Sequence, residues 1–356
     1  MNKPATNPEY IKGRGAQINP TSRFEKYDYD ENPRPDANED DAQLRTELIT
    51  VHPKTIVNKV SSPDIPFDFS LNPYQGCEHG CIYCYARNTH PYWGYSAGLE
   101  FEQKILVKKD AAELLESKIK HPKWKAVPIM LSGNTDCYQP AERKLKITRA
   151  LLEVFWKYRH PVGIITKNSL IMRDLGLLQK LASENLVQVS ISLTTLDERL
   201  RKFMEPRTAT SKARLKTIEM LASSGIPVNV MMAPIIPAMN DHEIFKLLEA
   251  AANAGATSAG HTIVRLNGDV EKIFVDWIQK NFPDRAEKVL NKIKDCHGGK
   301  TSDSRFKTRM SGEGKIAEII NKQFKMAKQK FFKGKKRPPL NCSLHTEFKT
   351  DQLKLF

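Results

Sequence analysis

The chain has few cysteines, no long apolar stretch and no apolar core near its beginning. Six cysteines in 356 residues are too few for the disulfide framework of a small secreted protein. No uninterrupted apolar stretch approaches the roughly 18 residues that suggest a membrane-spanning helix. Residues 1–8 hold no apolar core of the kind found in signal peptides. We therefore expect a cytoplasmic protein without a membrane partner.

Acidic residues are outnumbered as well, since 41 Asp and Glu face 56 Lys and Arg, for a net charge of +15. The segment between residues 25 and 41 is nevertheless acidic and polar, as in an extended arm. Eight basic residues crowd into positions 322–337, with Phe324, Phe331 and Phe332 among them. This basic segment either binds nucleic acid or forms a solvated helix face whose phenylalanines dock on the core.

Between these ends, strand and helix patterns alternate. The predicted strands cover residues 66–71, 127–131, 161–166, 186–195, 228–233 and 261–266. Such a series predicts an α/β fold with a parallel sheet and helices outside it. Residues 186–195 alternate apolar and polar side chains, whereas a strand covered on both faces is normally apolar throughout. We expect their polar face to line a wet, ligand-holding cavity.

The most informative motif is the spacing C-x₃-C-x₂-C of Cys77, Cys81 and Cys84, directly after the first strand. Three thiolates can hold three irons of a four-iron cluster and leave the fourth iron open to a ligand that is not protein. Zinc is the alternative, but structural zinc sites usually take four protein ligands from paired knuckles. Completing such a site would require one of the distant residues His79, Cys137, Cys296 and Cys342.

This motif resembles the radical S-adenosylmethionine (radical SAM) superfamily, whose first strand is followed by C-x₃-C-x-aromatic-C, with Tyr83 in the aromatic position here. The resemblance implies a partial (β/α)₆ TIM-like barrel with terminal extensions. We expect a polar extension at 1–60, the barrel at 61–270 and a basic helical extension at 271–356. Within the superfamily the motifs look most like the spore photoproduct lyase and "DNA repair photolyase" branch.

The resemblance also implies roles for single residues. Cys77, Cys81 and Cys84 would ligate a [4Fe–4S] cluster. The residues that would bind S-adenosylmethionine are Tyr83 and Tyr85 near the adenine, Thr135 and Ser192 at the methionine or ribose, Lys167 at the carboxylate, and the backbone of Ala233 at the adenine. Many members have Gly-Gly-Glu where this chain has Ser132-Gly133-Asn134, so Asn134 or Asp136 would replace the usual amine contact.

The implied chemistry is reductive cleavage of S-adenosylmethionine to methionine and a 5′-deoxyadenosyl radical, which takes a hydrogen from the substrate. An electron donor such as flavodoxin or ferredoxin would be needed. Cys137 is a candidate hydrogen donor, with packing in the core as the alternative. Arg207 or Lys212, in the loop after the fourth strand, and Arg265 are candidate anion clamps, with ion pairing inside the fold as the alternative.

Three hypotheses about function follow. The first is a lyase-like repair or modification enzyme acting on nucleic acid or a modified nucleotide. The second is a radical SAM enzyme acting on a small molecule or a protein side chain. The third is a zinc-dependent nucleic-acid binding module without catalysis.

Overall fold

The computed structural model describes residues 11–21, 24 and 45–349. The acidic stretch between residues 25 and 41, which the sequence predicts to be an extended arm, lies outside the described residues. In the described part of the chain, no helix combines the length and the apolar content needed to cross a membrane.

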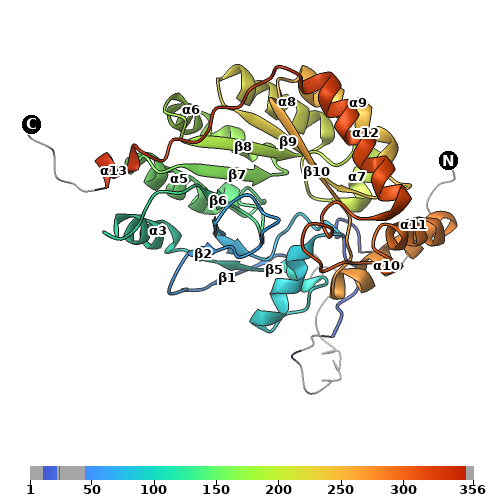
Figure 1. Cartoon of the computed structure of the whole chain (residues 1–356). Coiled ribbons are helices and arrows are strands. Elements are labelled where there is room, and N and C mark those ends of the chain that lie inside the picture. The colour runs from blue at the N-terminus through green and yellow to red at the C-terminus, as the bar shows by residue number, and fades with distance from the viewer. Residues whose placement is uncertain (1–10, 22–23, 25–44, 350–356) are drawn as a thin grey trace, which may run out of the picture.

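The main sheet contains the six predicted strands in consecutive order, each parallel to the next. They are β3 (Phe69–Leu71), β6 (Ile129–Leu131), β7 (Val162–Thr166), β8 (Val187–Ser192), β9 (Val228–Ile235) and β10 (Ser258–Ile263). β2 (Val57–Lys59) adds an antiparallel edge beside β3. The α/β fold is confirmed, and a sheet that ends at β10 and β2 agrees with the predicted partial barrel (Figure 1).

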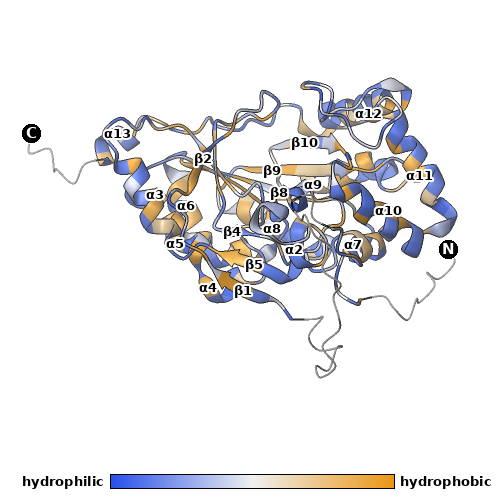
Figure 2. Cartoon of the chain, turned by 90° about the horizontal axis from the view of Figure 1, so that it is seen from below, coloured by the Kyte–Doolittle hydropathy of each residue, from blue (hydrophilic) through white to orange (hydrophobic). Residues whose placement is uncertain are grey.

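Helices cover the outer face of this sheet, as the alternating pattern predicts. The main ones are α3 (Ala111–Lys120), α5 (Ile147–Lys157), α6 (Leu175–Ser183), α8 (Ser211–Ser223) and α9 (Ile244–Asn253). Their buried leucines and isoleucines join the outward-facing side chains of the strands in one core. Figure 2 shows apolar residues on the central strands and hydrophilic ones over outer helices such as α11 and α13.

A second, smaller sheet lies beside the first. Its strand order is β1 (Glu47–Thr50), β5 (Lys104–Val107), β4 (Tyr74–Gln75). Both β1 and β2 fall in the stretch expected to be an N-terminal extension, and both pair with strands of the region expected to form the barrel. Short helices fill the loops: η1 (Tyr85–Trp93), α2 (Glu100–Gln103), α4 (Glu142–Leu145), η2 (Ser169–Asp174), α7 (Glu198–Met204) and η3 (Asp241–Glu243).

The inner face of the main sheet is partly polar. Val187, Val189 and Ile191 of β8 are buried against the outer helices, whereas Gln188 and Ser190 on the opposite face are partly exposed. Asn229 of β9 donates a hydrogen bond to the Ser190 hydroxyl at 3.3 Å, across the two strands. The alternation therefore places polar side chains on the inner face of the sheet. That this face lines a ligand-holding cavity stays a prediction.

The gap between the two edges of the sheet is bridged by residues 301–312, which we call the seam loop. Its Met310 carbonyl accepts a hydrogen bond from Ile263 of β10 at 2.9 Å. Across the gap, the Asp64 carboxylate, between β2 and β3, accepts from the Lys307 backbone at 2.7 Å and from Arg309 Nε at 2.6 Å. The seam loop thus ties one edge of the sheet to the other.

The C-terminal region consists of α10 (Asp269–Asn281), α11 (Pro283–Asp295), α12 (Gly314–Phe332) and α13 (His345–Phe348). α12 lies along α9 (Figure 1). Phe324 and Phe332 of the basic segment are buried, and the Phe324 ring stacks on His261 of β10 at 4.0 Å between centroids. These two phenylalanines dock on the core, whereas most of the lysines between them are exposed.

We expect Phe324→Ala to lower the free energy of unfolding by about 3–5 kcal/mol, because it leaves a cavity between α12 and the sheet. Met326 lies on the same helix but is 51% exposed, so Met326→Ala should change the stability by no more than about 0.5 kcal/mol. Urea unfolding of both variants measures the difference. Equal effects would show that α12 is not fixed to the sheet through Phe324.

We also expect the buried ring of His160 to make the folded protein less stable in acid. Burial and the charge of His345 lower the pKa of His160 to about 3, well below its usual 6.5. Below pH 6.5 the unfolded chain binds a proton at this ring and the folded chain does not, so stability falls by up to about 1.4 kcal/mol per pH unit. This loss continues until the pH approaches the folded pKa.

Unfolding free energies at pH 7 and pH 5 test this contribution. His160→Gln should lose about 2 kcal/mol less than the parent protein over this range, while His242→Gln, at an exposed position, should follow the parent. An unaltered pH dependence in His160→Gln would refute the assignment.

Candidate functional site

The three cysteines lie on the loop of residues 76–84, which we call the cysteine loop, at the carboxyl end of β3 and β4. Cys77 and Cys81 are buried, Cys84 is half-buried, and all three are free thiols. The loop begins at Gly76 with φ +82°, and Gly80 in its middle has φ +67°. A Cβ at Gly80 would lie 2.7 Å from the Glu102 carboxylate, so only glycine fits there.

An ion pair lies beneath the cysteine loop. Arg87 and Glu102 are both fully buried, with 2.5 Å between Arg87 Nη2 and Glu102 Oε1. Arg87 Nε also donates to the Cys81 carbonyl at 3.0 Å, and Glu102 accepts from the backbone of Gly15 and Ala16 at 3.0 and 2.8 Å. Removing one partner of such a buried pair lowers the free energy of unfolding strongly, because the remaining charge is unpaired and not solvated. The pair therefore fixes the middle of the loop to η1, α2 and the segment 11–21.

A second buried carboxylate, Glu205 after α7, holds the other side of the loop. It accepts hydrogen bonds from the Tyr83 hydroxyl and, at 2.7 Å, from Thr194 Oγ1. Arg214 of α8 pairs with it at 2.5 Å and Lys167 at 3.3 Å. Although burial raises the pKa of Glu205, the charges of Arg214 and Lys167 outweigh this and hold the pKa well below its ordinary value.

A third carboxylate joins the loop to β6 and β7. Asp136 accepts from Thr166 Oγ1 at 2.7 Å and from the Lys167 backbone at 2.8 Å, and it lies 3.3 Å from His79 Nδ1. Burial raises the pKa of Asp136, but the charge of His79 and these hydrogen bonds bring it below its usual value. Through these contacts Asp136 supports the loop, and its contact to the cofactor amine stays a prediction.

Thr135, next to Asp136 in the chain, also supports the cysteine loop. Its hydroxyl donates to the Gly76 carbonyl at 2.6 Å and accepts from Gln139 Nε2 at 3.0 Å. Gln139 Oε1 in turn accepts from the Glu78 backbone at 3.0 Å. The segment after β6 thus holds the start of the cysteine loop.

The remaining predicted residues lie around the same end of the sheet. Tyr85 is 50% exposed and donates to the Gly133 carbonyl. Ser192 is buried at the end of β8, and its carbonyl accepts from Arg214 Nη1 at 2.9 Å. Ala233 is half-buried near the end of β9 and precedes a cis peptide bond to Pro234. The structure therefore brings the predicted residues of strands two to five to the end that carries the cysteines.

Cys137, the candidate hydrogen donor, lies in the main core and not on the cysteine loop. It is fully buried within the main core, where its backbone N–H donates to Ser132 Oγ at 2.8 Å and its carbonyl accepts from Thr148 Oγ1 at 2.6 Å. Burial raises the pKa of this thiol. A packing role explains all of these contacts.

The pKa shifts and the arrangement of the three thiols bear on which kind of metal group they could hold. Burial raises the pKa of each thiol, and the charges of Cys81 and Cys84 raise that of Cys77 further. The charge of Lys167 acts in the opposite direction on Cys81 and Cys84. Yet among the described residues, no three His, Cys, Asp or Glu side chains are arranged to hold one metal ion.

This spacing fits a cluster better than a single ion. In an iron–sulfur cluster each thiolate binds a different iron, so the sulfurs need not converge on one point. A tetrahedral zinc site would need that convergence. The sulfur-only donor set of Cys77, Cys81 and Cys84 therefore fits an iron–sulfur group.

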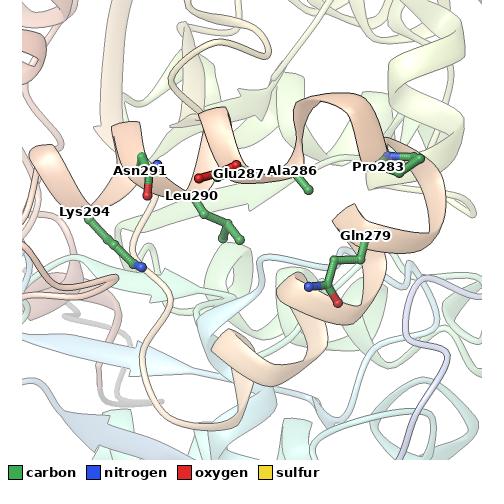
Figure 3. Close-up of a pocket in the computed structure, with 7 residues that line it drawn as sticks. All are labelled: Gln279, Pro283, Ala286, Glu287, Leu290, Asn291 and Lys294. Atoms are coloured by element: carbon green, nitrogen blue, oxygen red, sulfur yellow. The ribbon is translucent and has the colours of Figure 1, made fainter.

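A hollow of about 500 Å³ lies elsewhere, between α10 and α11. It is lined by Gln279, Pro283, Ala286, Glu287, Leu290, Asn291 and Lys294 (Figure 3). None of these side chains is a thiol or an imidazole, and we assign the hollow no part in the chemistry.

Sequence patterns did not reveal the carboxylates and arginines that support the loop. Glu205, Arg214, Arg87 and Glu102 come from four separate elements, and each looks like an ordinary surface residue in the sequence. Arg207, a predicted anion clamp, instead lies 3.3 Å from Glu78, which is an ion pair inside the fold. The sequence signal for close support of the loop was the pair Gly76 and Gly80, because glycines beside a cysteine motif indicate that other parts of the chain pack tightly around it.

Glu205→Gln should lower the free energy of unfolding by about 3–5 kcal/mol, because it leaves the buried Arg214 without its countercharge. Glu219 pairs with Lys216 on the exposed face of α8, so Glu219→Gln should cost about 0.5 kcal/mol or less. Denaturant unfolding of iron-free protein measures both. A Glu205→Gln variant as stable as Glu219→Gln would show that the Glu205 pair does not hold the fold.

Solved structures with the same fold include spore photoproduct lyase. A mutant of that enzyme with bound AdoMet and dinucleoside spore photoproduct matches 81% of this chain and 80% of its own, with TM-score 0.61 and 15% identity. A second mutant form of the lyase gives a TM-score of 0.59 at 16% identity, with the same coverage of both chains. At such identities the likeness is one of fold.

Sequence relatives extend across distant organisms. An uncharacterised protein of Mycobacterium tuberculosis is 33% identical over 234 residues, which are 65% of this chain and 69% of the relative. One of Methanocaldococcus jannaschii is 27% identical over 248 residues, 70% of this chain and 88% of the relative. The family model described as "Radical SAM superfamily" matches residues 71–251, from the end of β3 to α9. The chain, with its three-cysteine loop at the carboxyl end of the first parallel strand, belongs to the radical SAM superfamily.

Proposed function

We propose that this protein is an enzyme that holds a [4Fe–4S] cluster on Cys77, Cys81 and Cys84 and abstracts hydrogen from nucleic acid or a modified nucleotide. The observation that carries the proposal is the cysteine loop itself: two buried thiols and one half-buried thiol on one short loop, supported by buried ion pairs and not arranged to hold a single ion. When bound, the cluster and S-adenosylmethionine would supply a 5′-deoxyadenosyl radical.

The residues of this chain would position the reactants. Lys167 is 15% exposed and lies beside both Glu205 and the Tyr83 ring, so its ammonium can meet the carboxylate of S-adenosylmethionine without leaving its site. Ser192 and the Ala233 backbone, at the ends of β8 and β9, would contact the ribose and the adenine. Tyr85, half-exposed above the loop, would shield the cluster from water.

The fold and the charge of the protein motivate the nucleic-acid substrate. The structure of spore photoproduct lyase with dinucleoside spore photoproduct has the same fold, so repair or modification of a nucleotide is the leading hypothesis. The exposed lysines of α12 offer phosphate contacts. A small electron-transfer protein such as flavodoxin or ferredoxin would deliver the electron.

A second candidate function is that of a radical SAM enzyme acting on a small molecule or a protein side chain. The position of the basic segment supports it. Phe324 lies against His261 of β10, and Lys335 donates to the carbonyls of Ala252 and Ala256, which precede β10. The lysine-rich end of α12 therefore lies toward the amino ends of the strands, opposite the cysteine loop. On this hypothesis the lysines are a solvated surface.

Anaerobic reconstitution with iron and sulfide, followed by addition of reductant and S-adenosylmethionine, tests the proposal. We expect about four irons per chain, a brown protein and formation of 5′-deoxyadenosine. Cys77→Ala, Cys81→Ala and Cys84→Ala should each lose the cluster. The matched control is Cys342→Ala, since Cys342 lies in the C-terminal segment and makes only a weak contact to the Leu340 carbonyl at 3.7 Å.

Two other outcomes separate the hypotheses, and a third concerns Cys137. A colourless protein that binds one zinc and forms no 5′-deoxyadenosine would favour the non-catalytic binding module. Transfer of deuterium from a labelled metabolite rather than from labelled nucleic acid would favour the small-molecule enzyme. Cys137→Ala should retain the cluster, because its thiol lies in the main core.

A further inference from the structure

Arg265, just after β10, is a half-buried cation without a matching carboxylate. In the part of the chain that the structure describes, its guanidinium makes one long hydrogen bond, from Nη1 to the Asp303 carbonyl at 3.5 Å, and no ion pair. A guanidinium carries five N–H donors. A charge that is partly removed from water and incompletely bonded is costly, and such groups are commonly retained for binding.

The neighbours of Arg265 already have partners of their own. Arg309 is held by Asp64 and Ser62, and Arg305 is held by Asp303 and Glu313. With Lys307, the group around the seam loop holds four cations and three carboxylates, an excess of one positive charge. Burial and the nearby Arg309 lower the pKa of Arg265, while the charges of Asp64 and Asp303 act in the opposite direction.

The place of Arg265 connects this charge with the cysteine loop. Arg265 follows the carboxyl end of β10, the same end of the sheet at which the cysteine loop follows β3. Asn88 of η1, four residues after Cys84, donates a hydrogen bond to the Asn267 carbonyl at 2.7 Å, two residues after Arg265. An anion at Arg265 would thus lie at the end of the sheet that carries the cysteines.

We propose that Arg265 binds a singly charged oxyanion of the substrate, a phosphodiester or a carboxylate, and so fixes the substrate at the end of the barrel that carries the cysteines. This rests on the proposed function and narrows its substrate class. The planar fork of a guanidinium matches two oxygens of either group. The excess of one positive charge matches a monoanion, and the polar inner face at Ser190 and Asn229 remains for uncharged parts of the substrate.

Calorimetric titration with matched small probes tests the anion site directly. The probes are a dinucleoside monophosphate, its methylphosphonate analogue, which has the same shape without the charge, and acetate. The protein is used as purified and after anaerobic reconstitution. For the phosphodiester, Arg265→Gln should weaken binding by about tenfold to a hundredfold, and Arg265→Lys should recover part of the loss because it keeps the charge without the fork.

The control for non-specific attraction is Lys180→Gln, which removes the same charge from an exposed position on α6, outside the basic segment. It should change the affinity by no more than about twofold. Melting temperatures and iron contents of all variants should equal those of the parent protein, which excludes loss of folding as the cause.

The outcomes distinguish the two sources of the anion. Loss of phosphodiester binding in Arg265→Gln, together with weak binding of the methylphosphonate by the parent, supports a nucleotide substrate. Arg265-dependent binding of acetate alone supports a small carboxylate. If the parent binds neither anion, or if Arg265→Gln binds as the parent does, the inference is overturned. The formation of 5′-deoxyadenosine is measured separately, so failure of the proposed function would appear there.

Discussion

Buried carboxylates determine where the three cysteines lie. The cysteine loop contains two glycines with positive φ and has little regular structure of its own, so its shape depends on what surrounds it. Glu102 holds it through Arg87, Glu205 through Tyr83, and Asp136 through His79. Each of these acids is itself paired with a cation or hydrogen-bonded, so the supports are fixed before any cluster binds.

This arrangement has an electrostatic consequence. Burial and, after it, nearby acids raise the pKa of Cys77 and Cys81 in the iron-free protein. Cations act in the opposite direction, since Lys167 and Arg214 lower the pKa of Cys81. If a cluster binds, metal would replace the thiol protons. Arg265 adds a positive charge after the carboxyl end of β10.

Much of the fold was predictable because the strands follow a simple period. The alternation of residues 186–195 predicted both β8 and its polar inner face, and the cysteine spacing predicted the place of the site at the end of β3. The supports of the site were not predictable. Glu205 and Arg214 meet only after α7 and α8 have folded back onto β8, and no local pattern encodes that contact. The basic segment shows the same limit: charge spacing left two interpretations open, and only the burial of Phe324 and Phe332 shows that the helix docks on the core.

The central claim is that three protein thiolates leave one iron free for S-adenosylmethionine. Electron–nuclear double resonance of the reduced protein with S-adenosylmethionine labelled by ¹⁷O in its carboxylate and ¹⁵N in its amine measures this directly. The account predicts hyperfine coupling of both labels to the cluster, because the carboxylate and the amine would bind the open iron. A reduced cluster that shows no coupling to either label, with all four irons held by protein atoms, would contradict it.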